Sequence, residues 1–331
     1  MIVGEGLSEK DLETGIPFSG SSGWLLDQSL AQVGISRKEC YLTNIFNFRV
    51  GHLKNICGTK AEGIRGLPAL DKGRFLLPAY APELTRLYSE IRRESPNVII
   101  ALGSTAAWAL LHSTGIRAIR GATTGTHPLL TSQLGRVFKV LPTYSPAAIN
   151  REWSLRPIFL SDLDKAKSGS SCSDVRRPSR RILINPTLED IASYDRDFIQ
   201  PATRLSADIE TVGNQITCIG FAPSNSDCIV IPFHSKRAKD GNYWHTLEEE
   251  LQAWAFVTRW LKEKPTVFQN GLYDISFLWR SYGIPVPLAS EDTMLLHHAW
   301  QPEMQKGLGF LATLYTDEAS WKFMRKGTRH D

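Results

Sequence analysis

A run of small, polar and basic residues near the middle of the chain constrains its fold more than any other feature. Residues 168–181 (SGSSCSDVRRPSRR) show no apolar period, which is typical of a linker. The sequence therefore predicts two domains, at residues 1–167 and 182–331. With 331 residues, 42% of them hydrophobic, each domain is long enough to bury a core of its own.

The two predicted domains differ in charge. Residues 1–181 hold 24 Lys and Arg against 15 Asp and Glu, whereas residues 182–331 hold 14 against 19. A basic half suits a polyanion such as DNA and an acidic half can collect divalent cations, although unequal solvated surfaces also arise without function. No long apolar run and no signal peptide are present, so we expect a cytoplasmic protein without a membrane partner.

Short apolar strands alternate with helical patterns in the first half, which predicts a parallel α/β sheet. Strands are expected at 40–45, 97–102 and 137–141. Helices are expected at 24–33 and 83–93, and a third is expected to be capped by Ser104 and to end at Leu111. Residues 51–79 have no clear period and are expected to form a long loop.

The second half begins with strands. Three strands separated by short turns, which favour an antiparallel meander, are expected at 204–210, 216–222 and 228–233. Thr246 and Glu249 form a capping box for the helix that follows. The apolar side of this helix is expected to consist of Leu247, Leu251, Trp254 and Leu261. A strand at 266–269 and a helix at 272–282 complete a mixed α/β pattern.

Three carboxylates in the second half are candidate metal ligands. Asp208 and Glu210 lie two residues apart on an expected strand, so both side chains project from one face and can share a cation. Asp274 lies near the start of a helix, four residues after Asn270. Phosphodiester hydrolysis with two divalent ions needs such a cluster, and hard oxygen ligands favour Mg²⁺ or Mn²⁺. Alone, however, an Asp-x-Glu pair occurs in many strands without function.

Three segments in this half resemble, in order, the exonuclease motifs of family A DNA polymerases: SADIET (206–211), QNGLYDI (269–275) and EDTML (291–295). The resemblance covers about residues 182–326 and implies a ribonuclease-H-like fold with 3′-to-5′ proofreading exonuclease activity. It makes Asp208, Glu210 and Asp274 the metal ligands, and it makes Asn270 a substrate-binding residue that helps to position the strand terminus.

The same family has a fourth carboxylate, in a Tyr-x-x-x-Asp motif that this chain lacks. Asp331 is a poor substitute because chain termini are usually mobile. Asp292 is either a helix N-cap or part of the metal site. His297 and His298 point about 100° apart on a helix, and we expect them to be ordinary helix residues. Exonuclease activity is therefore expected only when a partner supplies the missing carboxylate.

Four segments of the first half resemble the uracil-DNA glycosylase superfamily, particularly its thermostable family 4. They are GEG to GIPFSG (4–20), YLTN (41–44), VIIALG (98–103) and LPTYSPAA (141–148). The resemblance covers residues 1 to about 166. It implies a fold built on a parallel sheet and a site for a base extruded from DNA.

This second resemblance also implies residue roles. Phe18 would stack on the extruded base and Asn44 would read its edge, while Glu5 and Asp11 fall in the loop where relatives keep acidic residues near the water and the sugar. Each residue also has a plain structural interpretation: loop packing for Phe18, a strand-end cap for Asn44, and solvated loop charges for Glu5 and Asp11.

Two departures from the glycosylase pattern weaken the case for turnover. Relatives have histidine where this chain has Ser145, and that histidine stabilises the negative charge on the departing base. Losing a preorganised donor typically costs roughly 10²–10³ in rate. Relatives also bind an iron-sulfur cluster through cysteine in a Lys-Cys-Arg-Pro segment, where this chain reads NFRV (47–50), so no iron-sulfur cluster is expected.

Together the two halves resemble the N-terminal part of certain bacteriophage family A DNA polymerases. This resemblance implies a DNA replication or repair module in the host cytoplasm, acting on single-stranded 3′ ends or primer-template DNA. The chain would be a fragment, a split-gene product or a truncated form, with a separately encoded polymerase domain as a possible partner. The alternatives are an active uracil-DNA glycosylase and a non-catalytic DNA-binding accessory module.

Overall fold

The computed structural model describes residues 1–175 and 177–320. Contacts divide the chain into two compact units, Met1–Arg176 with Gly309–Asp331, and Arg177–Leu308. The described residues from Gly309 onward thus belong with the first unit, whereas the sequence pattern assigns them to the second domain. The chain therefore passes between the two units twice, once near Arg177 and once near Leu308.

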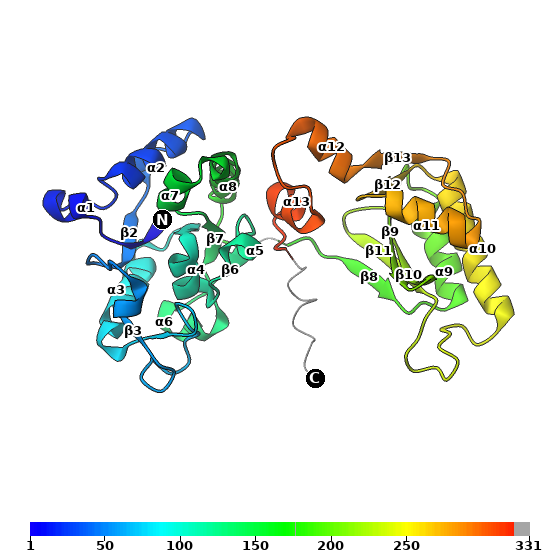
Figure 1. The fold of residues 1–331 in the computed structure, drawn as a ribbon, viewed down its shortest axis with the longest axis horizontal. Coiled ribbons are helices and arrows are strands. Elements are labelled where there is room, and N and C mark those ends of the chain that lie inside the picture. Colours follow the sequence, from blue (N-terminus) through cyan, green and yellow to red (C-terminus); the bar gives the residue numbers. More distant parts are fainter. Residues whose placement is uncertain (176, 321–331) are drawn as a thin grey trace. The chain divides into compact units, whose positions relative to one another are not determined.

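The first unit is built on a five-stranded sheet with the order β2-β1-β5-β7-β6 (Figure 1). Its strands are β1 (Ile2–Gly6), β2 (Leu42–Phe46), β5 (Ile99–Leu102), β6 (Thr124–Gly125) and β7 (Lys139–Thr143). All of the pairings are parallel except that between β6 and β7. The helices are α1 (Glu9–Thr14), α2 (Ser21–Gln32), α3 (Ala81–Glu94), α4 (Gly103–Leu111), α5 (Ile116–Ile119), α6 (Thr131–Leu134), α7 (Pro146–Arg151) and α8 (Arg156–Gly169).

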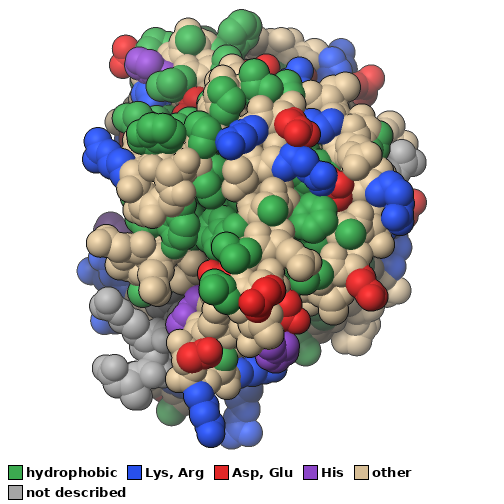
Figure 2. Space-filling view, turned by 90° about the vertical axis from the view of Figure 1, so that its right-hand side faces the viewer, with side chains coloured by type: hydrophobic (Ala, Val, Ile, Leu, Met, Phe, Trp, Pro, Cys, Tyr) green, Lys and Arg blue, Asp and Glu red, His purple; other side chains and the backbone are tan. Residues whose placement is uncertain are grey.

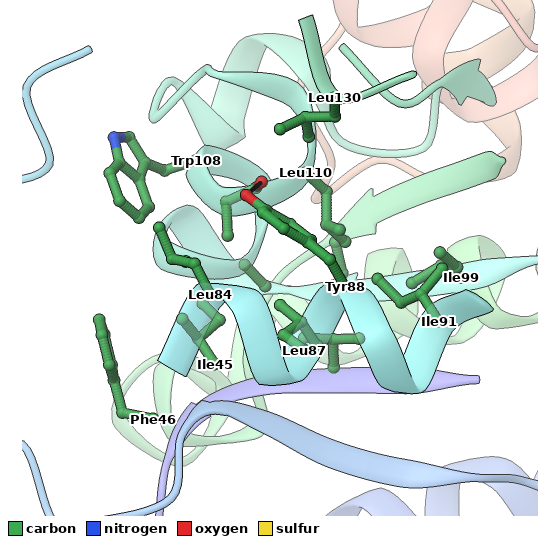
Figure 3. Close-up of a cluster of buried hydrophobic side chains, with 14 of the residues drawn as sticks. Ile45, Phe46, Leu84, Leu87, Tyr88, Ile91, Ile99, Trp108, Leu110 and Leu130 are labelled. Carbon is green, nitrogen blue, oxygen red and sulfur yellow. Dashed lines mark hydrogen bonds between the residues drawn. The ribbon is translucent and has the colours of Figure 1, made fainter. Parts of the chain in front are cut away.

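Both faces of this sheet are covered, as expected for parallel strands with near-continuous apolar sequences. On one face α2 and α8 pack through Leu26 and Phe159, which are fully buried. On the other face α3 contributes Leu87 and Tyr88 to a cluster with Trp108 of α4 (Figure 3). The buried Tyr88 hydroxyl donates to the carbonyl oxygen of Ala109 at 3.0 Å, so its polar end is satisfied.

The C-terminal helix α13 (Leu308–Tyr315) packs on the first unit through a buried polar network. The guanidinium of Arg120, which is 1% exposed, donates to both carboxylate oxygens of Asp162 and to the hydroxyl of Thr313. Lys165 Nζ donates to the carbonyl oxygen of Thr313 at 2.7 Å. Because a buried charge needs partners, these contacts tie α13 to the unit.

The second unit is built on a six-stranded mixed sheet with the order β13-β12-β9-β10-β11-β8. Its strands are β8 (Arg181–Ile184), β9 (Leu205–Val212), β10 (Gln215–Ala222), β11 (Asp227–Pro232), β12 (Thr266–Phe268) and β13 (Ala289–Asp292). Strands β9, β10 and β11 form an antiparallel meander, and β12 and β13 extend it in parallel with β9. The helices are α9 (Leu188–Tyr194), α10 (Leu247–Glu263), α11 (Leu272–Tyr282) and α12 (Thr293–Trp300).

This strand order confirms the predicted ribonuclease-H-like mixed sheet, and the first sheet confirms the predicted parallel α/β class. Both follow from local sequence, since short turns join the meander and helices separate the parallel strands. Strand β8 was not predicted, because four residues that follow a basic linker carry no period by themselves. It pairs in parallel with β11 at the edge of the sheet.

Two local predictions for the first half were wrong. Ser104 does not cap α4: the helix begins at Gly103, whose φ of 86° makes a sharp turn out of β5. The segment 51–79 is not a plain loop, since it contains the short antiparallel pair of β3 (Cys57–Gly58) and β4 (Phe75–Leu76). In the second half, the predicted capping box of Thr246 and Glu249 is confirmed.

The predicted apolar side of α10 was wrong by part of a turn. The buried residues are Ala253, Val257, Trp260 and Leu261, whereas Leu247 and Leu251 are more than half exposed. Figure 2 views the right-hand side of Figure 1, where α10 is labelled, and shows hydrophobic side chains lying among charged ones on that surface. None of the helices in the described part of the chain has the length and apolar character needed to cross a bilayer.

Candidate functional site

The main cavity of the first unit lies at the carboxyl ends of its parallel strands, where ligands generally bind in open α/β sheets. Its volume is about 780 Å³. The cavity brings together all five candidate residues of the first half, which the sequence spreads over 140 positions: Glu5, Asp11, Phe18, Asn44 and Ser145.

Asn44 and Phe18 face the same small space above Gly4. A Cβ atom added to Gly4 would lie 2.4 Å from Asn44 Oδ1 and 2.7 Å from the Phe18 ring, so only glycine leaves this space open. Asn44 is 2% exposed and its Oδ1 atom has no hydrogen-bond partner among the described residues. Its backbone carbonyl oxygen accepts from Arg86 at 2.7 Å, which fixes the strand. A buried acceptor without a partner is rare and calls for a ligand or a water.

Phe18 is held in a left-handed backbone conformation, with φ of 57°, that non-glycine residues rarely adopt. Two contacts hold it there. Arg37 donates to the carbonyl oxygens of Pro17 and Phe18, and Gly23 passes so close that a Cβ would lie 1.7 Å from the Phe18 carbonyl oxygen. Such strain persists where the surrounding structure enforces it, which is common in binding sites.

The two acidic residues of the first half have different surroundings. Glu5 lies at the end of β1 on the cavity wall and accepts a short hydrogen bond from the Thr105 hydroxyl of α4. Asp11 is buried and accepts from the backbone N–H groups of Ser8 and Ser19. Burial alone would raise the pKa of Asp11, but these hydrogen bonds hold it below its usual value. Asp11 therefore fixes the loop, whereas Glu5 faces the cavity.

Ser145 is the N-cap of α7, and its side chain accepts from the backbone N–H of Ala148 at 3.3 Å. The hydroxyl proton is left over for a ligand. Serine carries no positive charge. Ser145 therefore offers a ligand one neutral hydrogen-bond donor, whereas an anionic ligand would need a cation at this position. Three exposed cations, Arg49, Arg117 and Arg151, also line the cavity, and Arg49 forms an ion pair with Glu9.

The acidic residues of the second unit lie where β9 meets the start of α11. Asp208 and Glu210 are exposed and alternate with the buried Ala207 and Ile209, so they share one face of the strand. Asp274 is buried, and its Oδ1 atom accepts from the backbone N–H of Ile209 at 3.0 Å. Burial and the charge of Asp208 raise the pKa of Asp274 to about 6. The carboxylates are thus close enough to repel one another.

The donor chemistry of these three carboxylates fits a hard divalent cation. A cation would also relieve the repulsion that disfavours ionised Asp274. The three carboxylates do not form a complete metal site, since no group of three His, Cys, Asp or Glu side chains within the described residues is arranged to hold a metal ion. Asp331 lies outside the described residues. The side chains present therefore form an open, partial site.

Asp292 connects the start of α11 with the start of α12. Its carboxylate accepts from the backbone N–H groups of Met294 and Leu295 as the N-cap of α12, which confirms that interpretation. It also accepts from the N–H groups of Asn270 and Gly271, at 3.1 and 2.8 Å. Burial would raise the pKa of Asp292, but these four donors lower it. Asn270, with φ of 62°, is thereby fixed in the turn before Asp274.

A second hollow, about 450 Å³ in volume, adjoins this turn and is lined by Asn270 and Tyr273, among others. The Tyr273 hydroxyl lies 2.6 Å from the hydroxyl of Thr211, which follows Glu210 directly. His297 is buried in α12 and His298 is its neighbour on that helix. Sequence reasoning missed Tyr273 and the cavity residue Thr105, although both lie within the quoted motifs or next to them.

Comparison with known proteins identifies relatives that are similar in sequence to the first unit. A family model for the uracil DNA glycosylase superfamily matches residues 1–166. The type-4 uracil-DNA glycosylase of Thermotoga maritima is 34% identical over 172 residues, which cover 51% of this chain and 76% of that protein. The corresponding enzyme of Pyrobaculum aerophilum is 29% identical over 163 residues, covering 49% and 74%.

Solved structures similar to part of the chain include exonucleases. Escherichia coli RNase D, an exoribonuclease involved in structured RNA processing, has a TM-score of 0.33 at 17% identity, over 46% of this chain and 36% of that chain. Brucella melitensis NrnC with bound Mg²⁺ has a TM-score of 0.29 at 18% identity, over 43% and 63%. This chain thus spans less than two thirds of either protein, and these scores add nothing to what the strand order establishes.

Proposed function

The chain belongs to the uracil DNA glycosylase superfamily, and from this premise we propose that its first unit binds a base extruded from DNA. The observation that carries the proposal is the buried, unpartnered Asn44 Oδ1 facing the Phe18 ring across Gly4. An amide can accept from the N3–H of uracil and donate to a neighbouring carbonyl oxygen of the base, while the ring stacks on its face.

Turnover at this site is expected to be weak. Cleavage of the bond between base and sugar leaves negative charge on the base, and Ser145 offers one neutral hydrogen bond to that charge. We assign Glu5, held by Thr105, to the water that attacks the sugar carbon, and Asp11 to the loop that positions Phe18. The first unit then serves mainly to recognise and hold a base.

This proposal is tested by substituting the glycine that leaves the space open. Gly4→Ala would push a methyl group against Asn44 and Phe18, whereas Gly115→Ala adds one where nothing lies within 4 Å. We expect Gly4→Ala to weaken binding of a uracil-containing strand relative to a thymine-containing one, with Gly115→Ala unchanged. The Asn44→Ala variant should lose about 1–3 kcal/mol of the same preference. Equal binding of both strands by the unaltered chain would refute base recognition.

Free-base release is the matching catalytic test. Ser145→His adds the missing cation, and we expect release of uracil to rise by roughly 10²–10³ if the rest of the site is competent. Ser145→Ala serves as the control for loss of the α7 cap. Vigorous release by the unaltered chain would instead favour the alternative, an active uracil-DNA glycosylase.

For the second unit we propose metal-dependent removal of nucleotides from DNA 3′ ends. The supporting observation is the carboxylate cluster, in which Asp208 and Glu210 share a face beside a buried Asp274 of raised pKa. These three would hold Mg²⁺ or Mn²⁺, which when bound supplies an activated water and neutralises charge on the leaving oxygen. Asn270 and Tyr273 line the adjoining hollow and would orient the terminal nucleotide.

The exonucleases that this half resembles have a fourth carboxylate, and we propose that full activity requires one to join Asp208, Glu210 and Asp274. The test is degradation of a 5′-labelled strand with Mg²⁺. Asp208→Ala should abolish it. An unchanged rate in this variant would sink the assignment and favour a DNA-binding accessory module, whose affinity should fall steeply with salt.

A further inference from the structure

A basic loop joins β11 to α10 in the second unit. Residues 234–242 are closed at their base by a bridge between His234 and Asn242, and the Ser235 N–H donates to the Gly241 carbonyl oxygen at 2.9 Å. Asn242 is fixed in turn by Glu250 of α10 at 2.7 Å. The loop therefore has a defined base, and it projects away from the body of the unit (Figure 1).

Three of the four residues at 236–239 in this loop are cations: Lys236, Arg237 and Lys239. All three side chains are exposed, and no hydrogen bond or ion pair of theirs is found within the described part of the chain. Their unit, Arg177–Leu308, holds 13 Lys and Arg against 16 Asp and Glu. The loop also holds Asp240, whose carboxylate accepts from the Asn242 N–H at 3.1 Å, so three cations face one carboxylate within the loop. A positively charged loop in an acidic unit is the arrangement expected where a polyanion passes close to acidic residues.

The strand register places the base of this loop near the carboxylates. Glu210 pairs with Cys218 across β9 and β10, and Cys218 pairs with Pro232, the last residue of β11. Two strand spacings correspond to about 10 Å. Thr217 forms hydrogen bonds with both the Glu210 position on β9 and the base of the loop. Its hydroxyl donates to the Glu210 carbonyl oxygen, and its own carbonyl oxygen accepts from the His234 N–H.

We propose that the loop 234–242 binds phosphate groups of the DNA strand whose 3′ end reaches Asp208, Glu210 and Asp274. This inference rests on the proposed nuclease function and gives its substrate a second point of attachment. When the terminal nucleotide lies at the carboxylates, the phosphates of the preceding nucleotides lie about 10 Å or more from those carboxylates. The base of the loop begins at about the same distance from them. Three flexible cations can neutralise those phosphates without reading the bases.

The test uses the full chain, a labelled single-stranded oligonucleotide, and Ca²⁺ in place of Mg²⁺. Each phosphate contact on a single strand contributes about 0.7 to the slope of log affinity against log salt. Replacing Lys236, Arg237 and Lys239 together with Ala should lower that slope by about 2 and weaken binding up to about 100-fold at 0.1 M salt. An unchanged slope and affinity would overturn the proposal.

Single substitutions provide a matched control. Lys262 is exposed and lies in the last turn of α10, near the other end of the sheet, where the Leu205 N–H at the start of β9 donates to the Pro265 carbonyl oxygen. We expect Arg237→Ala to lower the slope by about 0.7 and Lys262→Ala to leave it unchanged. Equal effects of the two would mean that only overall charge matters, which would contradict a specific role for the loop.

Neutral methylphosphonate linkages separate this inference from the nuclease function. Linkages near the 3′ end should weaken binding to the unaltered chain but not to the triple variant, while linkages near the 5′ end should weaken both equally. That pattern would support the loop contact even if the unaltered chain degraded no strand. Strand degradation with no difference between 3′ and 5′ linkages would leave the nuclease proposal standing and refute the loop contact.

Discussion

At the scale of single residues, the two candidate sites are marked by polar groups that the fold leaves in unfavourable states. The Asn44 Oδ1 atom is buried without a hydrogen-bond partner among residues 1–175 and 177–320, which costs roughly 1–3 kcal/mol. Asp274 is buried beside Asp208, so its ionised form is disfavoured. Both costs are removed by the ligands that we propose, a base in the first case and a cation in the second.

The pH dependence of stability should reveal Asp274. Because burial and Asp208 raise its pKa to about 6 in the folded chain, the folded chain holds this proton more tightly than the unfolded chain does. Stability should therefore fall as pH rises from about 4 to about 6 and stay lower above it. Asp274→Asn keeps an acceptor for the Ile209 N–H and never ionises, so its Tm should exceed that of the unaltered chain increasingly from about pH 4 to about pH 6 and by a constant amount above it.

The measurement is a series of thermal unfolding curves in EDTA. Asp197→Asn, on the exposed surface of the same unit, is the control and should show no such trend. Adding Mg²⁺ at pH 7 should raise the Tm of the unaltered chain more than that of Asp274→Asn. A difference in Tm between these two proteins that stays constant with pH would contradict the raised pKa.

At the scale of elements, Asp292 joins two helix starts through four backbone N–H groups. Asp292→Ala removes a helix cap, which costs about 1–2 kcal/mol, and also releases the turn that holds Asn270 before Asp274. We expect both a lower free energy of unfolding and weaker Mn²⁺ binding, the second measured by electron paramagnetic resonance. Glu291→Gln breaks only the exposed ion pair with Arg204 and should change neither by much.

The docking of α13 can be measured in the same way. Thr313→Val takes away the hydroxyl that accepts from Arg120, leaving a donor of a buried guanidinium unpaired at a cost of about 1–3 kcal/mol. Thr316→Val, three residues later, removes an exposed hydroxyl that donates to the Ala312 carbonyl oxygen and accepts from the Glu318 N–H. Because no buried charge loses its partner there, this variant should cost less than Thr313→Val. Urea unfolding of both variants is the test. Equal losses would mean that the buried network does not hold α13.

The elements show how far sequence reasoning reaches. The parallel α/β class of the first sheet, the antiparallel meander of the second and the capping box follow from local patterns, because turn length and helix alternation determine which strands pair. The five cavity residues were expected together only from the resemblance to the glycosylase superfamily. The apolar side of α10 was misjudged because Leu247 and Leu251 keep the helical spacing while Ala253 and Val257 face the sheet. The placement of α13 depends on Arg120 and Asp162, almost 200 and about 150 residues earlier, and no local pattern indicates such a contact.

At the scale of the whole molecule, one chain carries the two sites for which we propose different parts of a nucleic acid strand as ligands. The first unit offers a cavity lined by Phe18 and Asn44, and the second offers an open carboxylate cluster beside a basic loop. Among the described residues, the exposed cations for which no ion pair is found include Arg117 and Arg151 at the cavity and Lys236, Arg237 and Lys239 on the loop at 234–242. Each unit thus pairs its own site with positive charge.

The two passages of the chain between the units make the second unit an insertion within the first. Limited trypsin digestion at the exposed Arg180 would cut only one of these passages, since the bond between Arg177 and Pro178 resists trypsin. We expect the two resulting fragments to elute together in gel filtration and to separate only in urea, because α13 remains seated on Arg120 and Lys165. Separate elution without denaturant would contradict this. To obtain the second unit alone, the chain must be cut at two places.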